Sequence, residues 1–180
     1  MLLGYRSSII LALEMAISAT LSLWLGTWFS QALNIDTASI GGLWSAISAI
    51  LITQATNQET FKAAWLRVIG SLIGAIAAGI VVSLFGYAWW AFALGMLLTV
   101  VVCSLVNLAD TFRLACLTLS VVMVIGQLTP AMNPWINSAG RFVESLIGVI
   151  VALLIAIPLK PLRHKLRLAY QTSVMVKRPK

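Results

Sequence analysis

The feature that most constrains this chain is a series of long apolar runs that contain almost no charge. Apolar residues make up 61% of the 180 residues, and charged residues make up only 9%. Soluble domains average about 45–50% apolar and about 25% charged residues. A soluble domain of this size exposes too much of its surface to bury so many apolar side chains. The composition therefore excludes a soluble enzyme, a disordered chain and a secreted disulfide scaffold, and it places most of the chain in lipid.

Six apolar segments are candidates to cross a bilayer. About 20 helical residues span a hydrocarbon core of about 30 Å, and in lipid the backbone must be helical because no water is present to bond it. The segments are Ser8–Ala32, Thr37–Asn57, Ala63–Phe85, Tyr87–Leu108, Phe112–Leu128 and Ala139–Leu159. We therefore expect an all-α integral membrane protein with six transmembrane helices over residues 1–159. Residues 160–180 are expected to form a basic cytoplasmic tail that begins near Pro161.

The placement of lysine and arginine predicts the orientation, because cytoplasmic loops are enriched in these residues. With the N-terminus inside, eleven of the 12 cations lie on the cytoplasmic side, and Arg141 alone lies outside. Both termini are then cytoplasmic, in a bacterial cytoplasmic membrane. An outer aromatic belt is expected from Trp28, Trp44, Tyr87, Trp89, Trp90 and Trp135. The net charge of +7 lies mostly in the tail, which indicates contact with anionic headgroups and no nucleic-acid partner.

Two stretches of the sequence repeat each other. Arg67-Val-Ile-Gly-Ser-Leu-Ile-Gly is matched by Arg141-Phe-Val-Glu-Ser-Leu-Ile-Gly, so that the third segment corresponds to the sixth. Each half, about 8–85 and 87–159, then holds three helices, and an odd number inverts one half relative to the other. Inverted repeats are a frequent plan of transporters, with the substrate bound between the halves. The alternative is a chance similarity between two lipid-embedded helices.

Small residues recur at helical spacing in both repeats, which favours close packing of helices in lipid. They are Gly70, Gly74 and Ala78 in the third segment, and Gly148, Ala152 and Ala156 in the sixth. The repeat breaks at one position, where Glu144 stands opposite Gly70. A carboxylate is therefore expected on a buried, close-packed face.

A family resemblance follows from these residues. Gly42-Leu-Trp-Ser-Ala-Ile-Ser-Ala-Ile-Leu-Ile-Thr-Gln54 followed by the Arg67 motif resembles the membrane module of the aromatic acid exporter and fusaric acid resistance (FUSC-like) superfamily, and the Arg141 motif resembles that family's last helix. The resemblance covers about residues 5–160. It implies a six-helix bundle that exports aromatic or other organic acids as a homo-oligomer. A dimer is the simplest expectation, because most oligomers are symmetric dimers. Many members continue into a large cytoplasmic region, whereas only about 20 residues follow here, so an accessory role stays open.

A charged side chain inside an apolar segment indicates a structural or functional role, because inserting it into the bilayer costs about 2.5–3.5 kcal/mol. Glu14 shares a helical face with Ser18 and Ser22. This stripe is either a proton or substrate site, or a carboxylate paired with an arginine of a neighbouring helix.

Arg67 and Arg141 are each expected to open a helix, where the helix dipole favours a bound anion. Arg67 is alternatively a cation that snorkels to the cytoplasmic surface. Glu144 follows Arg141 at i+3, within reach of an ion pair. The pair is either structural or a switchable carboxylate beside an anion-binding arginine. In the second case, an anion that competes for the arginine would couple export of an acid to proton entry.

Other polar residues give weaker indications. Thr53 and Gln54 end the second segment, and Thr99, Cys103 and Asn107 share a face of the fourth. They could bond a substrate, although hydrogen bonds between helices are the favoured interpretation. The sequence has no Ser/His/Asp or Cys/His set, no metal-ligand spacing and no Walker motif. We therefore expect no enzyme activity, no cofactor and no metal.

Three functions stay open at this stage. The leading hypothesis is a secondary exporter of organic anions, in particular aromatic carboxylates, driven by the proton gradient. The alternatives are a passive organic-anion channel of the same fold and an accessory membrane subunit of a larger transporter.

Overall fold

The computed structural model describes the backbone of residues 2–33, 38–54 and 56–176, and the side chains from 9 to 159 of these ranges except at 57. The described residues form helices joined by short turns, with no strand among them, which confirms the all-α prediction. Its elements are α1 (Leu2–Ala32), α2 (Ala38–Ile52), α3 (Asn57–Phe85), α4 (Trp89–Leu105), a 3-10 turn η1 (Ala109–Thr111), α5 (Phe112–Leu128) and α6 (Pro134–Val176). Each of the six predicted segments overlaps mainly with one helix, although only the bounds Phe112–Leu128 agree at both ends.

Four of the helices are long and apolar enough to cross a membrane. These stretches are Ile9–Ala32, Gln58–Phe85, Ala109–Leu128 and Pro134–Leu159. α2 and α4 are apolar but shorter, with 15 and 17 residues. At about 1.5 Å per residue, they are shorter than a hydrocarbon core of about 30 Å. The fold is thus that of a multi-pass membrane protein, and six complete crossings stay a prediction.

Local chemistry explains where α3 begins and ends. The Glu59 backbone N–H donates to Thr56 Oγ1 at 3.2 Å, and the Thr56 hydroxyl donates to the Glu59 carboxylate at 2.7 Å. These two contacts are a capping box, which fixes the start of a helix. Gly86 ends the helix with a φ of 69°, a conformation that glycine adopts without strain.

The expected bounds of the sixth helix are wrong at both ends. α6 begins at Pro134, a first-turn position where the missing proline N–H costs nothing. It then continues to Val176, past Pro158 and past Pro161, which was expected to mark an end. A proline removes one backbone hydrogen bond, whereas the Leu, Lys, Arg and Ala residues around and beyond these prolines favour helix. The predicted basic tail is therefore helical as far as Val176.

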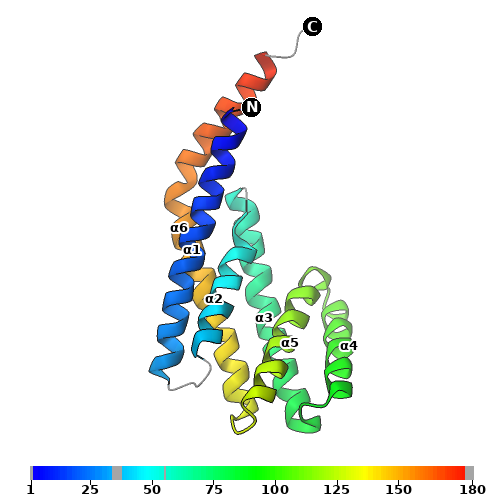
Figure 1. The fold of residues 1–180 in the computed structure, drawn as a ribbon. Coiled ribbons are helices and arrows are strands. Elements are labelled where there is room, and N and C mark those ends of the chain that lie inside the picture. Colours follow the sequence, from blue (N-terminus) through cyan, green and yellow to red (C-terminus); the bar gives the residue numbers. More distant parts are fainter. Residues whose placement is uncertain (1, 34–37, 55, 177–180) are drawn as a thin grey trace.

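The helices pack in an arrangement that relates the two halves (Figure 1). α1 lies against α2 and α6 on one side of the bundle, and α4 lies at the opposite edge against α5 and α3. α6 of the second half packs on α2 of the first, and α3 of the first half packs on α5 of the second. If α3 corresponds to α6 and α2 to α5, these two contacts are equivalent. This agrees with the predicted repeat, whose inversion stays a prediction.

The glycines of the repeat make matching contacts. Gly148 of α6 lies so close to α2 that a Cβ there would overlap the Ser45 carbonyl oxygen and the Ser48 Cβ. Gly74 of α3 stands in the same relation to the Ala115 carbonyl and the Thr118 Cβ of α5. All the small residues predicted to face neighbouring helices are buried, as expected: Gly70, Gly74, Ala78, Gly148, Ala152 and Ala156.

The interior is more polar than the outer surface. Large apolar side chains point outward, including Trp24 at 65% exposed and Leu154 at 64%. Arginine, glutamate, serine and threonine side chains are buried among the helices. This distribution suits a protein whose surrounding solvent is lipid.

Candidate functional site

Arg67 and Arg141 are the two largest fully buried side chains in the described part of the chain, each 0% exposed. Neither opens its helix, because α3 begins at Asn57 and α6 at Pro134. The expected role of a helix N-terminus at these arginines is therefore wrong. Arg67 also does not snorkel to the surface, since its whole side chain is enclosed.

The Arg67 guanidinium is held by two serines and a tryptophan. Its Nε and Nη2 donate to Ser48 Oγ at 3.2 and 2.9 Å, and Nη2 also lies 3.3 Å from Ser145 Oγ. Its central carbon lies 4.6 Å from the centre of the Trp44 ring. A cation over an aromatic ring in a dry site is worth about 2 kcal/mol. The Arg67 Nη1 has no hydrogen-bond partner among the described residues.

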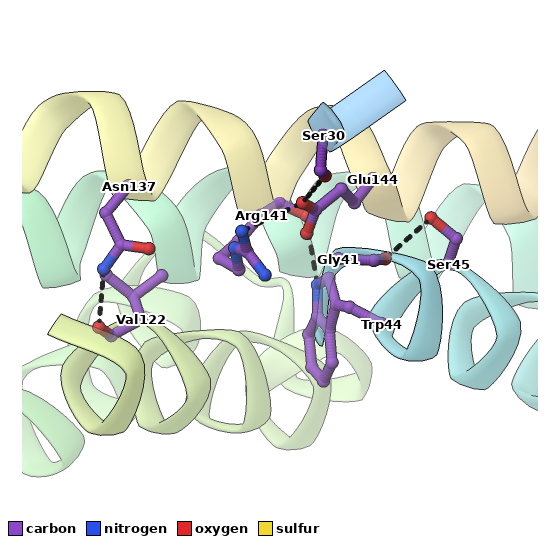
Figure 2. Close-up of polar contacts among 8 residues, drawn as sticks. All are labelled: Ser30, Gly41, Trp44, Ser45, Val122, Asn137, Arg141 and Glu144. Atoms are coloured by element: carbon purple, nitrogen blue, oxygen red, sulfur yellow. Dashed lines mark hydrogen bonds and ion pairs between the residues drawn. The ribbon is translucent and has the colours of Figure 1, made fainter. Parts of the chain in front are cut away.

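Trp44 is itself fixed from α6. Its indole Nε1 donates to the Arg141 carbonyl oxygen at 3.0 Å, and its side chain is 3% exposed (Figure 2). The expectation that Trp44 belongs to an outer aromatic belt is wrong. Its N–H finds a partner on α6 inside the bundle, whereas a belt residue would use water or headgroups.

The predicted pair of Arg141 and Glu144 is present. Arg141 Nη2 lies 2.9 Å from Glu144 Oε1, and the Ser30 hydroxyl of α1 donates to the same oxygen at 2.7 Å. Both charged side chains are 0% exposed. In the described structure, Arg141 Nε and Nη1 and Glu144 Oε2 have no hydrogen-bond partner. Figure 2 shows the carboxylate between α6, the end of α1 and the start of α2.

A glycine of α2 makes room for this carboxylate. A Cβ at Gly41 would overlap Glu144 Oε1 and the Ser30 hydroxyl. Any other residue at this position would push the carboxylate from its place. The space that Gly41 leaves therefore allows Glu144 to lie inside the bundle.

We call Trp44, Ser48, Arg67, Arg141, Glu144 and Ser145 the arginine cluster. It holds two guanidinium groups and one carboxylate, so it carries one excess positive charge while Glu144 is ionised. A buried charge without compensation is strongly unfavourable. A bound anion would cancel this charge only while Glu144 stays ionised, and in either state it would accept hydrogen bonds from the partnerless N–H groups of the arginines.

The structure does not bring every predicted residue to this cluster. Glu14 is 1% exposed and shares a buried face of α1 with Ser18 and Ser22, as predicted. Thr53 and Gln54 belong to the turn between α2 and α3. The Thr53 hydroxyl donates to the Ala49 carbonyl at 2.8 Å, and the Gln54 backbone N–H donates to Thr60 Oγ1 at 3.2 Å.

The polar residues assigned to the fourth segment also lie elsewhere. Thr99 and Cys103 are buried on α4, and the Thr99 hydroxyl donates to the Gly95 carbonyl at 2.7 Å. Asn107 is exposed and lies beyond the end of α4, with a φ of 56°. Asparagine tolerates this left-handed conformation, so the residue belongs to a turn and shares no helical face with the other two.

An open groove of about 930 Å³ lies between α4 and α5. Its lining is almost entirely apolar, and none of the residues of the arginine cluster contributes to it. An apolar surface groove is ordinary for a protein in lipid, so the candidate site remains the arginine cluster.

Sequence reasoning missed Ser30, Trp44, Ser48 and Ser145 as members of the site. One signal was available, because Trp44 and Ser48 lie at i and i+4 within the motif Gly42–Gln54. These two residues therefore share one face of α2, beside the glycines that bring this helix close to α1. Ser30 and Ser145 carry no comparable signal.

The model of a protein family described as aromatic acid exporter family member 1 matches residues 4–159. The chain belongs to this family. The match confirms the resemblance found in the sequence, and it includes the whole arginine cluster. Neither curated proteins nor solved structures give a significant match. At the level of the family, the protein is a membrane exporter of aromatic acids, and the family is one of transporters.

Proposed function

We propose that this protein exports aromatic carboxylates and that the arginine cluster binds the carboxylate of the substrate. One observation carries the proposal: Arg67 and Arg141 are both fully buried, and the Glu144 carboxylate pairs with Arg141, whereas Arg67 is held by Ser48 and Trp44. Charge-assisted hydrogen bonds from arginine to carboxylate are strong, and they are stronger still where water is excluded.

Each member of the cluster has a distinct role. The Nη1 of Arg67 and the Nε and Nη1 of Arg141 donate to the substrate. Ser48 and Trp44 hold the Arg67 guanidinium in place from α2. Because all of these side chains are enclosed, the substrate reaches them only when helices of the two halves move apart, as in alternating access.

Glu144 links anion binding to a proton. While ionised, it competes with the substrate for Arg141 and repels the substrate's negative charge. When the substrate displaces it from Arg141, burial favours its neutral form. Anion and proton therefore bind together, and the affinity for the anion rises as the pH falls. With this linkage, the anion and the proton cross the membrane in the same direction. The sequence-based expectation was the reverse, an exported anion exchanged for an entering proton.

The test measures binding of radiolabelled benzoate to the purified chain, in a pH range where benzoic acid is fully ionised. We expect wild-type affinity to rise as the pH falls. Glu144→Gln should bind benzoate independently of pH, with the affinity that the wild type reaches at low pH. Asp110→Asn removes an exposed carboxylate and should behave as wild type. If Glu144→Gln leaves the pH profile unchanged, the coupling role is wrong and only the ion pair remains.

A second variant tests the anion site itself. Arg67→Lys keeps the positive charge but loses the planar fork, so we expect benzoate affinity to fall by about ten-fold or more. Affinity equal to wild type would exclude the arginine cluster as the substrate site. Benzoate flux is then compared between liposomes that hold only this chain and protein-free liposomes. Faster flux with the chain supports the proposal, and equal flux indicates an accessory subunit. A passive channel would carry benzoate without moving protons.

The proposed setting follows from the charge distribution. We place the protein in the bacterial cytoplasmic membrane with both termini inside, as a homodimer. The basic residues 160–180 then lie at the anionic headgroups of the inner leaflet. In this orientation, the Glu14 end of α1 is the cytoplasmic end.

A further inference from the structure

The buried face of α1 is polar along most of its length. Every fourth residue on this face is buried, and the series is Glu14, Ser18, Ser22, Gly26 and Ser30. Among the described elements, α1 packs only against α2 and α6, so this face lies at the junction of three helices. From the first to the last of these residues, the helix rises about 24 Å, which is most of a hydrocarbon core.

Two hydroxyls on this face do not make the usual bond of a helical serine. Many serine and threonine hydroxyls in this protein donate to the carbonyl four residues earlier. Examples are Thr20 to Ala16, Ser48 to Trp44, Thr99 to Gly95 and Thr118 to Leu114. Ser18 and Ser22 are 0% exposed and have no hydrogen-bond partner among the described residues. A buried hydroxyl left without a partner costs about 1–3 kcal/mol, so these groups call for a partner that the described protein does not supply.

The series of polar groups leads to the arginine cluster. At its far end, the Ser30 hydroxyl donates to Glu144 Oε1 at 2.7 Å. Gly26 has no side-chain oxygen, but the Ser45 hydroxyl of α2 lies beside it, where a Cβ on Gly26 would overlap Ser45 Oγ. Ser45 therefore supplies the oxygen at this point of the series. Neighbouring positions along the face are about 6 Å apart, the rise of four helical residues. Two water molecules in a row span this distance with three hydrogen bonds of about 2.8 Å each.

We propose that this face of α1, with Ser45 of α2, is a hydrated route that carries protons between Glu14 and Glu144. Its hydration is independent of the proposed function, whereas its use for transport rests on the proton linkage at Glu144. When the substrate displaces Glu144 from Arg141, the nearest water gives a proton to the carboxylate. Protons then shift along the waters toward Glu144, and Glu14 relays replacement protons from its own side of the membrane.

The hydration is tested with Ag⁺, an ion that reaches thiols through narrow water-filled paths. Ser18→Cys and Ser22→Cys are made in a Cys103→Ser/Cys116→Ser chain and placed in liposomes. The controls are Ile17→Cys and Leu21→Cys, on the same helix but 49% and 44% exposed toward lipid. We expect the thiols at 18 and 22 to react at least about ten-fold faster than the controls, because charged groups are excluded from hydrocarbon. Equal rates at buried and lipid-facing positions would overturn the proposal.

The proton route is tested with two variants of equal shape. Ser22→Thr keeps a hydroxyl, and Ser22→Val replaces it with a methyl group of the same size. Proton uptake after mixing with benzoate should be about ten-fold slower in Ser22→Val than in Ser22→Thr, since an apolar group interrupts the waters. Both variants should bind benzoate as tightly as wild type at equilibrium. Equal uptake rates would refute the route. If the wild type binds no benzoate, the proposed function fails, while the Ag⁺ reaction still decides whether the face is hydrated.

Discussion

The close approach of α6 to α2 can be tested by adding one methyl group at Gly148. In Gly148→Ala, the new Cβ would overlap the Ser45 carbonyl oxygen and lie 2.8 Å from the Ser48 Cβ. The carbonyl belongs to the backbone, so it moves only if the helix moves. Overpacking of this kind costs about 1–3 kcal/mol, and alanine regains up to about 1 kcal/mol of helix propensity. We expect the free energy of unfolding to fall by about 1–2 kcal/mol.

Two further glycines supply a counterpart and a control. Gly74→Ala places its Cβ on the Ala115 carbonyl, as Gly148→Ala does on Ser45, so its loss of stability should be the same. At Gly95, the nearest atoms are side-chain methyl carbons of Leu119 at 3.2 Å and of Val81 at 3.3 Å. These side chains can turn aside. Gly95→Ala should therefore match the wild type or gain up to about 1 kcal/mol.

The measurement is equilibrium unfolding in mixed micelles of a non-ionic detergent and dodecyl sulfate, followed by far-ultraviolet circular dichroism. The three variants differ from the wild type by the same single methyl group, so differences among them report the local packing. If Gly148→Ala is as stable as Gly95→Ala, α2 and α6 are not in the close contact described. If Gly148→Ala and Gly74→Ala differ by more than about 1 kcal/mol, the two halves are not equivalent at this contact.

Four further predictions follow. Gly41→Ala should lower the free energy of unfolding, because its Cβ displaces the buried Glu144 carboxylate from Arg141, and it should change the pH dependence of benzoate binding. Trp44→Phe should lower the free energy of unfolding by about 1 kcal/mol, through loss of the bond to the Arg141 carbonyl, whereas Trp89→Phe should not. A reporter fused to the C-terminus should be active only inside the cell; activity outside contradicts the orientation. The mass in mild detergent should be that of a dimer, and a monomer at every concentration tested would exclude it.

The helices could be predicted from the sequence because lipid imposes both their conformation and their length. The bounds Phe112–Leu128 of α5 were predicted to the residue. The start of α3 was missed because the hydropathy of the segment rises only at Ala63. The Thr56 and Glu59 capping box was a readable signal that the helix begins earlier. Using it would have placed Arg67 inside the helix and removed the snorkelling interpretation.

The site was predictable only where its parts are local. Arg141 and Glu144 stand at i and i+3 on one helix, so their ion pair follows from helix geometry alone. The contact of Arg67 with Trp44 joins two helices, and that of Glu144 with Ser30 joins the first helix to the last. Such contacts depend on how closely the helices approach, which hydropathy does not encode.

The two predicted halves differ at one position of the candidate site, which carries a carboxylate in the second half and a glycine in the first. Gly70 of α3 lies against the Thr111 carbonyl and Leu114, where added bulk would meet α5. Its counterpart in the predicted repeat is Glu144, which occupies the space left by Gly41 of α2. Each of the two helix pairs therefore depends on one glycine. Gly70 of α3 lets α5 approach, and Gly41 of α2 leaves space for the Glu144 carboxylate of α6. The Glu144 carboxylate therefore lies on α6, beside Arg141 of the same helix. In the proposed function, this carboxylate competes with the bound anion for Arg141 and therefore favours release of the anion.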